Sequence, residues 1–250
     1  MFKFMIAGRR HAGFTRLEFS RYYQRVHGGK VLADPDNYVD RYTQNHVIDC
    51  CNALQDDGSQ LPEVDGVSEL WFADAATMQR ATSTPHYKSV IQPDETVFTD
   101  AARVIVVACA EEEQDVSSPR NGRLKAMRYL RRRAGVTQQA FFEAWRAETA
   151  RLAAHPVLAS RICRLVRNHA LPGGEKEVDE SFVRGAAINV YDGIESIWFD
   201  GAADTDLVSA YRAAVAEEAS LIAGLLDPRA DLFVVAEERQ ILPLIRTTGI

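Results

Sequence analysis

Long apolar runs are missing from this 250-residue sequence. The longest run, Val104–Ala110, has the length of a strand, whereas a membrane-spanning helix needs about 20 apolar residues. The first residues also lack the apolar core and the cleavage site of a secretory signal, because Arg9 and Arg10 follow too soon. We therefore expect no membrane partner, no secretion and a cytoplasmic location.

Cysteine is scarce and forms no functional pattern. Cys50 and Cys51 are adjacent, which is a poor geometry for a disulfide, and none of the four cysteines stands in a Cys-x-x-Cys pair. Reduced thiols are the simplest interpretation and agree with a cytoplasmic protein. The histidines and carboxylates also lack the spacing that is typical of a metal site, so we expect no metal.

Positive charge is also in short supply. The formal net charge is -6, and the one strongly basic run, Arg131–Arg133, is short. A nucleic-acid partner requires a basic face, so the composition argues against nucleic acid as the main partner. The sequence has neither a glycine-rich phosphate loop before a helix nor a Gly-x-Ser-x-Gly turn, which argues against nucleotide binding and against a hydrolase of that kind.

The most informative feature that the sequence does contain is an internal repeat. Four blocks of the first half recur in the same order and at nearly constant spacing in the second half, which is improbable by chance. The matched blocks are Gly13–Thr15 with Gly135–Thr137, Arg41–His46 with Arg164–His169, Asp65–Phe72 with Asp192–Phe199, and Val107–Glu111 with Phe233–Glu237. The polar stretch 114–122 contains Pro and Gly, as a linker does. We therefore predict modules at residues 1–113 and 123–250, joined by this linker.

Each copy follows the order strand, helix, two strands, helix, strand, which is the ferredoxin-like order. Thr15 and Glu18 form a capping box and predict a helix start. The expected strands of the first copy are 3–9, 41–48, 66–73 and 103–110, with a second helix at 75–82; the second copy is expected to have its first strand at 124–130 and a longer second helix at 206–226.

The third strand of the first copy carries large apolar side chains on both of its faces. Helices cover one face, so a second sheet must cover the other, and the second copy supplies it. The predicted fold class is therefore α+β, with two ferredoxin-like βαββαβ modules packed sheet to sheet as an intramolecular dimeric α/β barrel.

Three segments of the first copy resemble the EthD family of the dimeric α/β barrel superfamily. They are Arg9–Gly28, Arg41–Val47 and Asp65–Phe72, and the second copy matches more loosely. The resemblance implies a cofactor-free pocket between sheet and helices in each module and a small-molecule substrate. Relatives in the superfamily include polyketide cyclases, dehydratases, decarboxylases, muconolactone isomerases and monooxygenases.

His27 is the first candidate for a catalytic residue. Phe19, Tyr23 and His27 are each four residues apart, so they share the helix face that packs toward the sheet. This places an imidazole, which titrates near neutral pH, at the mouth of the expected pocket. The second copy has Thr149 there, so we expect that copy to have kept the fold and lost the chemistry. The alternative is a structural histidine at a helix end.

Two further residues are candidates for proton transfer. His46 belongs to the second strand, and the second copy keeps a histidine there, which fits either a pocket group or a structural histidine. Glu69 stands between Val67 and Trp71, surroundings that would raise the pKa of its carboxyl and suit a general acid or base. The alternative for Glu69 is a buried ion pair with an arginine such as Arg9 or Arg41.

The remaining candidates are assigned to substrate binding. They are Tyr23, Tyr42, Trp71 and His86 in the first copy, and His169 and Trp198 in a second pocket. The alternatives are core positions for the two tryptophans and a surface position for His86.

Together these residues predict a cofactor-independent lyase or isomerase that acts on a small aromatic or polyketide-like molecule. His27 would transfer protons in a dehydration, decarboxylation, cyclisation or isomerisation. Two alternatives are a haem-binding barrel with His46 or His169 as the axial ligand, and a non-catalytic small-molecule binding protein. We also expect two chains to associate as a homodimer.

Overall fold

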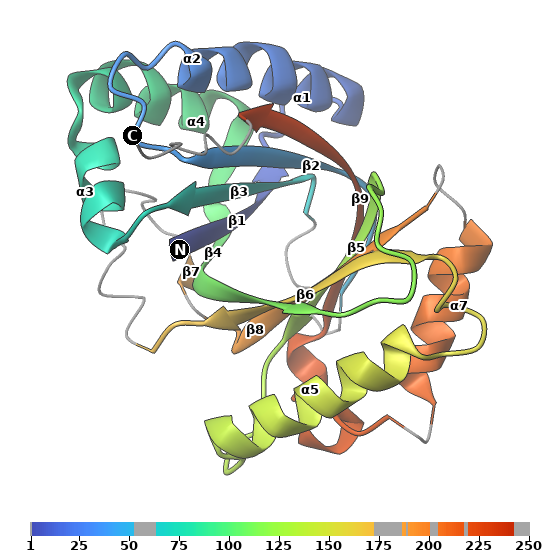
Figure 1. Ribbon diagram of the computed structural model, residues 1–250. Coiled ribbons are helices and arrows are strands. Elements are labelled where there is room, and N and C mark those ends of the chain that lie inside the picture. Colours follow the sequence, from blue (N-terminus) through green and yellow to red (C-terminus); the bar gives the residue numbers. More distant parts are fainter. Residues whose placement is uncertain are drawn as a thin grey trace, which may run out of the picture.

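The computed structural model describes residues 2–52, 64–172, 187–188, 190–200, 205–217 and 220–242, and it shows a ring of strands with helices on its outside (Figure 1). The strands are β1 (Phe2–Arg10), β2 (Arg41–Asn52), β3 (Gly66–Phe72), β4 (Thr99–Gln114), β5 (Leu124–Leu130), β6 (Ile162–Ala170), β7 (Ala187–Ile188), β8 (Gly193–Phe199) and β9 (Leu232–Leu242). The strands expected in the first half fall on β1 to β4, and β2 and β4 are longer than predicted.

All described strands except β7 close into one antiparallel barrel. The first half contributes the strand order β2-β3-β1-β4, and the second half contributes β6-β8-β5-β9. β2 pairs with β9 and β4 pairs with β6, so the edge strands of each half are covered by those of the other half. Closure removes the exposed edges that a separate four-stranded sheet would present. The fold class is therefore α+β with an antiparallel barrel.

The helices lie in two groups on the outside of the barrel. They are α1 (Arg16–Tyr22), α2 (Gly28–Leu32), α3 (Ala75–Ser83), α4 (Gln92–Phe98), α5 (Gln138–Ala153) and α7 (Thr205–Ala216). Figure 1 shows α1 to α4 over the strands of the first half and α5 and α7 beside those of the second. Helix α7 ends at Ala216, so the continuous helix expected to reach residue 226 was wrong. None of the described helices is long and apolar enough to cross a membrane.

The entry to α1 confirms the predicted capping box. The Thr15 hydroxyl accepts a hydrogen bond from the Glu18 amide, and the Glu18 carboxylate accepts one from the Thr15 amide. Both groups satisfy amides that have no partner inside the helix. A π-helical turn, Tyr23–His27, joins α1 to α2, and a second one, Tyr87–Ile91, leads into α4. These two turns contribute Tyr23, His27, Tyr87 and Ile91 to the buried layer between helices and sheet.

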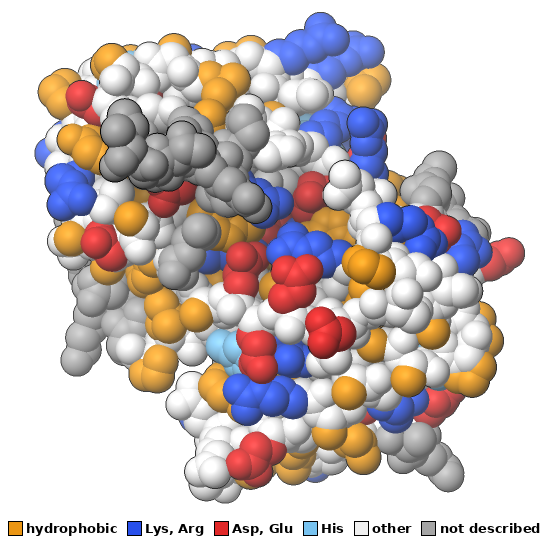
Figure 2. Space-filling view, in the orientation of Figure 1, with side chains coloured by type: hydrophobic (Ala, Val, Ile, Leu, Met, Phe, Trp, Pro, Cys, Tyr) orange, Lys and Arg blue, Asp and Glu red, His pale blue; other side chains and the backbone are white. Residues whose placement is uncertain are grey.

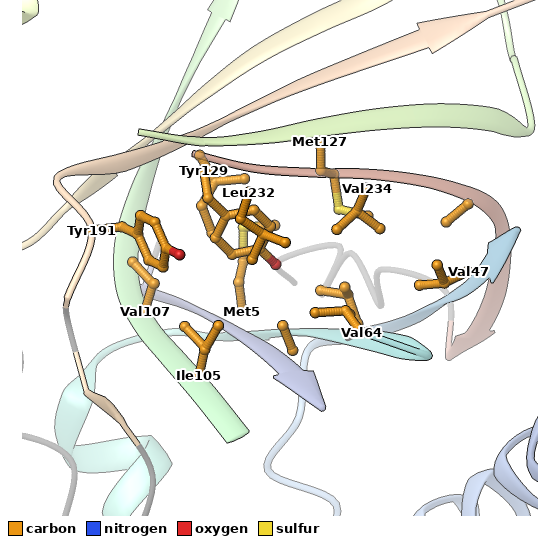
Figure 3. Packing of buried hydrophobic residues seen from close by; sticks show 14 of the residues in the cluster. Met5, Val47, Val64, Ile105, Val107, Met127, Tyr129, Tyr191, Leu232 and Val234 are labelled. Carbon is orange, nitrogen blue, oxygen red and sulfur yellow. The ribbon is translucent and has the colours of Figure 1, made fainter. Parts of the chain in front are cut away.

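Alternate residues of each strand point into the barrel and form its apolar core. Met5, Val107, Met127 and Val234 belong to one buried cluster, and Figure 3 shows these side chains pointing toward one another in the space that the strands enclose. Val107 therefore corresponds to Val234, whereas the sequence blocks matched it to Phe233, which belongs to another cluster outside the barrel. That match was wrong by one residue, and such a slip exchanges the two faces of a strand.

Residues 115–123, between β4 and β5, contain neither helix nor strand. Gln114, which was expected to begin the linker, ends β4, and the division into two modules stays a prediction. Acidic and basic side chains lie side by side across the middle of the face seen in Figure 2, between the two groups of helices.

Candidate functional site

A cavity of about 110 Å³ lies between the sheet of the first half and the helices that cover it. Strand residues whose side chains point away from the barrel form its floor, and these include Ile6, Gly8, Tyr42, Gly66, Ser68, Leu70 and Phe72. Residues of the helices and of the two π-helical turns form its roof, and these include Tyr23, His27, Val31, Ala81, Tyr87, Ile91, Glu95 and Phe98. The lining is mostly apolar with a few polar groups, as is usual for a small-molecule site.

Gly66 allows the helix to approach the floor of the cavity closely. A Cβ atom at this position would lie 3.0 Å from a ring carbon of Tyr23 and 3.1 Å from the ring of Phe19. Most side chains at residue 66 would therefore displace these rings. The Tyr23 hydroxyl and the Ser68 hydroxyl are 2.6 Å apart, which fixes the tyrosine against β3.

Tyr42 is held at the floor by Gln44. The Gln44 amide donates hydrogen bonds to the Tyr42 hydroxyl at 2.8 Å and to the Tyr23 carbonyl at 2.7 Å. Burial raises the pKa of Tyr42 to about 12 and that of Tyr23 well above its ordinary value, so both stay protonated at neutral pH. The structure thus brings both predicted substrate-binding tyrosines to the cavity.

His27 faces the same cavity and is held by a carboxylate. Its Nδ1 lies 3.0 Å from Oδ2 of Asp94. The other oxygen of this carboxylate, Oδ1, accepts hydrogen bonds from the Tyr22 hydroxyl at 2.6 Å and from Lys30 at 2.5 Å. Burial alone would raise the pKa of Asp94, but the hydrogen bonds from His27, Lys30 and Tyr22 lower it to about 2. An ionised Asp94 accepts the Nδ1 proton, which leaves Nε2 as the ring nitrogen that can take a proton.

Phe98 fixes the other side of the imidazole. The ring centroids of His27 and Phe98 are 4.8 Å apart, and Tyr23 stacks on Phe98 at 5.8 Å. The His27 side chain is only 8% exposed. The predicted helix face of Phe19, Tyr23 and His27 is therefore present, and it points toward the sheet as expected.

Glu95 is a cavity residue that the sequence analysis missed. Burial is the main cause that raises the pKa of its carboxyl to about 8, and the charge of Asp94 adds to it, while a hydrogen bond from Tyr87 opposes the shift. Glu95 is half-buried, and it lines the cavity. A signal was present: Glu95 is four residues after Ile91 and three before Phe98, on the apolar stripe of a helix.

His46 lies beneath α1 and does not line the cavity. Its Nδ1 is 2.8 Å from the Ser20 hydroxyl and its Nε2 is 3.2 Å from the Gln44 side-chain oxygen. Burial lowers the pKa of His46 to about 4, and the nearby Arg239 adds to this effect. The imidazole is therefore neutral at physiological pH and bonded on both sides, which favours the structural alternative.

His86 is also outside the cavity lining. Its Nε2 lies 2.9 Å from the carbonyl oxygen of Lys30, so it connects the second π-helical turn to α2. The structure therefore gives His86 a role in holding two segments of the roof together.

Glu69 lies inside the barrel, on the opposite side of the sheet from His27. It forms ion pairs with Lys3, at 2.6 Å, and with Lys125 of the second half. Burial opposes ionisation, but the two ammonium groups hold the pKa of Glu69 below its ordinary range. The expectation of a raised pKa was wrong, because the sequence did not reveal which charges face this carboxyl. An ion pair is present, but its partners are lysines rather than Arg9 or Arg41.

The two tryptophans flank this ion cluster inside the barrel. Lys3 lies 4.5 Å from the ring centroid of Trp71, and Lys125 lies 4.1 Å from that of Trp198. The indole nitrogens donate to Glu111 at 2.9 Å and to Glu238 at 2.8 Å. Both tryptophans are therefore core residues, as the alternative interpretation held, and neither lines the cavity.

The second half fills the corresponding layer with bonded side chains. The Trp145 indole donates to Glu195 at 3.0 Å, and the Tyr211 hydroxyl donates to the same carboxylate at 2.5 Å. Thr149, in the position of His27, donates to the Trp145 carbonyl at 3.0 Å and accepts from Arg167. The residue that corresponds to His27 therefore has a hydroxyl group in place of an imidazole, and the loss of chemistry in this half stays a prediction.

His169 and His46 both lie outside the cavity, so neither could be the axial ligand of a haem bound there. The Nε2 of His169 is 2.7 Å from Glu112, and its ring lies against Phe142 and Trp145. Both nitrogens of His46 are within hydrogen-bond distance of polar groups, as described above. Neither imidazole lines the cavity. His27, His46 and Glu69 also lie in three different environments and do not form a metal site.

A comparison with known families finds a match within the first half of the chain. Residues 11–102 match the family described as EthD domain, and this range includes the segments that form the cavity. The resemblance read from the sequence is therefore confirmed, and the first half contains an EthD domain. No curated protein matches the chain.

Solved structures match nearly the whole chain at low sequence identity. An anthrone oxidase-like protein matches with a TM-score of 0.57 and 11% identity over 99% of this chain and 96% of that chain. A candidate monooxygenase from Fusobacterium nucleatum matches with a TM-score of 0.53 and 5% identity over 96% and 93% of the two chains. A mutant chlorite dismutase from Candidatus Nitrospira defluvii matches with a TM-score of 0.53 and 7% identity over 94% of this chain and 91% of that chain. At these identities the likeness shows the fold alone, a dimeric α/β barrel.

Proposed function

We propose that this chain, whose residues 11–102 form an EthD domain, is a cofactor-independent enzyme that moves protons on a small aromatic or polyketide-like molecule. The reaction class is dehydration, decarboxylation, cyclisation or isomerisation. One observation carries the proposal: an imidazole, oriented by an ionised carboxylate, lines a mostly apolar cavity.

His27 acts as the general acid and base. When Nε2 accepts a proton, Asp94 stabilises the resulting imidazolium through the Nδ1 hydrogen bond, because that carboxylate stays ionised. The apolar lining strengthens this electrostatic effect by excluding water. Tyr23, Tyr42 and Phe98 supply flat apolar surfaces, and this favours an aromatic substrate.

His46 and Glu69 act on the site from a distance under this proposal. His46 positions Gln44, which in turn holds the Tyr42 hydroxyl at the cavity floor. Glu69 neutralises the two lysines within the barrel and so keeps the strands of both halves together.

We further infer that residues 1–113 and 123–250 are two ferredoxin-like modules, of which the second keeps a structural role. The same strand order in both halves supports this inference. Association of two chains stays a prediction, and light scattering tests it: a monomer mass would contradict it.

A ligand screen by thermal shift tests the proposed function. The screen uses phenolic acids, hydroxylated aromatics and short polyketide mimics on the wild type, on His27→Ala, and on His155→Ala as a control at a histidine that does not line the cavity. We expect a compound that both variants bind and that the wild type and the control convert, whereas His27→Ala loses activity by at least about 10²-fold. An unchanged rate in His27→Ala would contradict the assignment, and binding without conversion would favour the carrier alternative.

Cofactor-free oxygenation of an aromatic ring is the second candidate function. The names of two structures with the same fold, an anthrone oxidase-like protein and a candidate monooxygenase, favour it. The same base would remove a proton from a hydroxylated aromatic, which makes the ring more electron-rich toward oxygen. Oxygen consumption during conversion of the identified compound separates this candidate from the first.

A further inference from the structure

Two acidic residues that follow each other in α4 have different environments. The carboxylate of Asp94 points to His27, Lys30 and Tyr22 and is held by hydrogen bonds to all three. Glu95 lines the cavity itself, together with His27. One short helix therefore orients the imidazole with its first carboxyl and places its second carboxyl at the cavity.

Glu95 has no positive partner among the described residues. The Lys30 ammonium group forms an ion pair with Asp94 Oδ1 at 2.5 Å. The described residues that line the cavity include neither lysine nor arginine. The groups that face Glu95 are the Tyr87 hydroxyl from the neighbouring π-helical turn, Tyr42 from β2, His27 from the first turn and the Asp94 carboxylate from its own helix. An anion beside another anion in apolar surroundings is unfavourable, so this carboxyl keeps its proton at neutral pH.

We propose that Glu95 is a second catalytic residue of this cavity, donating its proton to an oxygen of an uncharged aromatic carbonyl substrate while His27 removes a proton from carbon. The proposal rests on the proton-transfer function above and deepens it. It assigns one acid and one base to the same cavity, a pairing in which two titratable groups have environments that separate their roles.

The proposed step transfers two protons and leaves the total number of protons and electrons unchanged. The C–H bond next to the carbonyl breaks and its proton moves to Nε2 of His27, while the electron pair forms the carbon–carbon double bond of an enol. The Glu95 O–H bond breaks and its proton moves to the carbonyl oxygen. In the reverse direction the Glu95 carboxylate takes the enol proton back, and the imidazolium returns its proton to a carbon. No oxidant, reductant or cofactor is consumed.

The charge of the cavity also selects the substrate. Asp34 contributes a further acidic side chain to the lining, and none of the described lining residues is a lysine or an arginine that could pair with a carboxylate. An aromatic ketone, aldehyde or amide accepts a hydrogen bond from protonated Glu95, whereas an aromatic carboxylate would be buried close to the ionised Asp94 without a cationic partner from the described lining. Neutral carbonyl compounds are therefore the expected class.

Two measurements on the full chain test this proposal without a known substrate. The first is carbon-13 NMR of glutamate carboxyls, in which Glu95→Gln identifies the Glu95 signal and Glu143→Gln serves as an exposed-carboxyl control. We expect the Glu95 signal to titrate near pH 8. Titration near the ordinary glutamate value overturns the proposal.

The second measurement is the binding of 1-naphthamide and of 1-naphthoate between pH 7 and pH 9. If a protonated Glu95 donates to the amide carbonyl, the dissociation constant of 1-naphthamide should rise about tenfold over this range in the wild type and stay flat in Glu95→Gln. Binding of the amide that is absent or flat in the wild type overturns the donor role, as does naphthoate binding as tightly as the amide. Failure of the proposed function looks different: the probes then bind with this pH dependence, but no compound of the ligand screen is converted.

Discussion

Replacing Glu69 by glutamine should weaken the whole barrel, because this carboxylate is the counter-charge of two buried lysines from different halves. Lys3 and Lys125 are both completely buried, and each contacts Glu69. Removing one member of a buried ion pair costs about 3–5 kcal/mol. Lys3 keeps Glu111 at 2.9 Å and Lys125 keeps Glu238 at 3.1 Å, so we expect the lower end, about 3 kcal/mol.

Urea unfolding followed by circular dichroism measures this loss. With a slope of about 3 kcal/mol per molar urea, the midpoint of Glu69→Gln should fall by about 1 M. The control is Glu113→Gln, a carboxylate that is 59% exposed and pairs with Arg164, which should cost at most about 1 kcal/mol. Equal losses in the two variants would refute the reasoning. The lowered pKa of Glu69 also predicts that this stabilisation is complete above the ordinary glutamate pKa and disappears as the pH falls through the folded-state value.

Three further predictions concern the cavity. Asp94→Asn should reduce turnover of the compound found in the screen on the order of 10²-fold with little change in its binding, because an amide does not stabilise the imidazolium of His27; steady-state kinetics checks this. Gly66→Ala should cost about 1–3 kcal/mol in urea unfolding and weaken aromatic ligands, since its Cβ would lie 3.0 Å from Tyr23. The raised pKa of Glu95 means that the folded state holds this proton more tightly than the unfolded state, so unfolding free energy should fall as pH rises from 4.5 to 8, and Glu95→Gln should flatten that part of the profile measured by urea unfolding.

Much of the fold was accessible from the sequence because its signals are local. The capping box at Thr15 and the helical spacing of Phe19, Tyr23 and His27 depend on neighbouring residues, and the structure has both. The internal repeat also predicted that the second half would supply the missing side of the barrel. The match of the last strand was one residue off, since an apolar run such as Val104–Ala110 does not show which residues face inward.

The candidate site was only partly accessible, because burial and charge depend on contacts between distant segments. Glu69 looked like an isolated carboxyl between apolar neighbours, and its lysine partners are 66 residues before and 56 residues after it in the sequence. Glu95 and Asp94 were missed because their positions at the cavity depend on how α4 packs against the first π-helical turn. Pattern alone placed His27 correctly but did not reveal the carboxylate that orients it.

Solvent-deuterium exchange tests the central claim most directly. An enolisable aryl ketone of suitable size, 1-tetralone, is incubated in deuterated buffer with the wild type, His27→Ala or the His155→Ala control, and proton NMR follows the loss of the C2 proton signal next to the carbonyl. The account predicts that the wild type and the control accelerate exchange over buffer, and that His27→Ala loses this acceleration by at least about 10²-fold. Exchange that is no faster with wild type than in buffer, or equally fast with His27→Ala, would contradict proton transfer by His27 in this cavity.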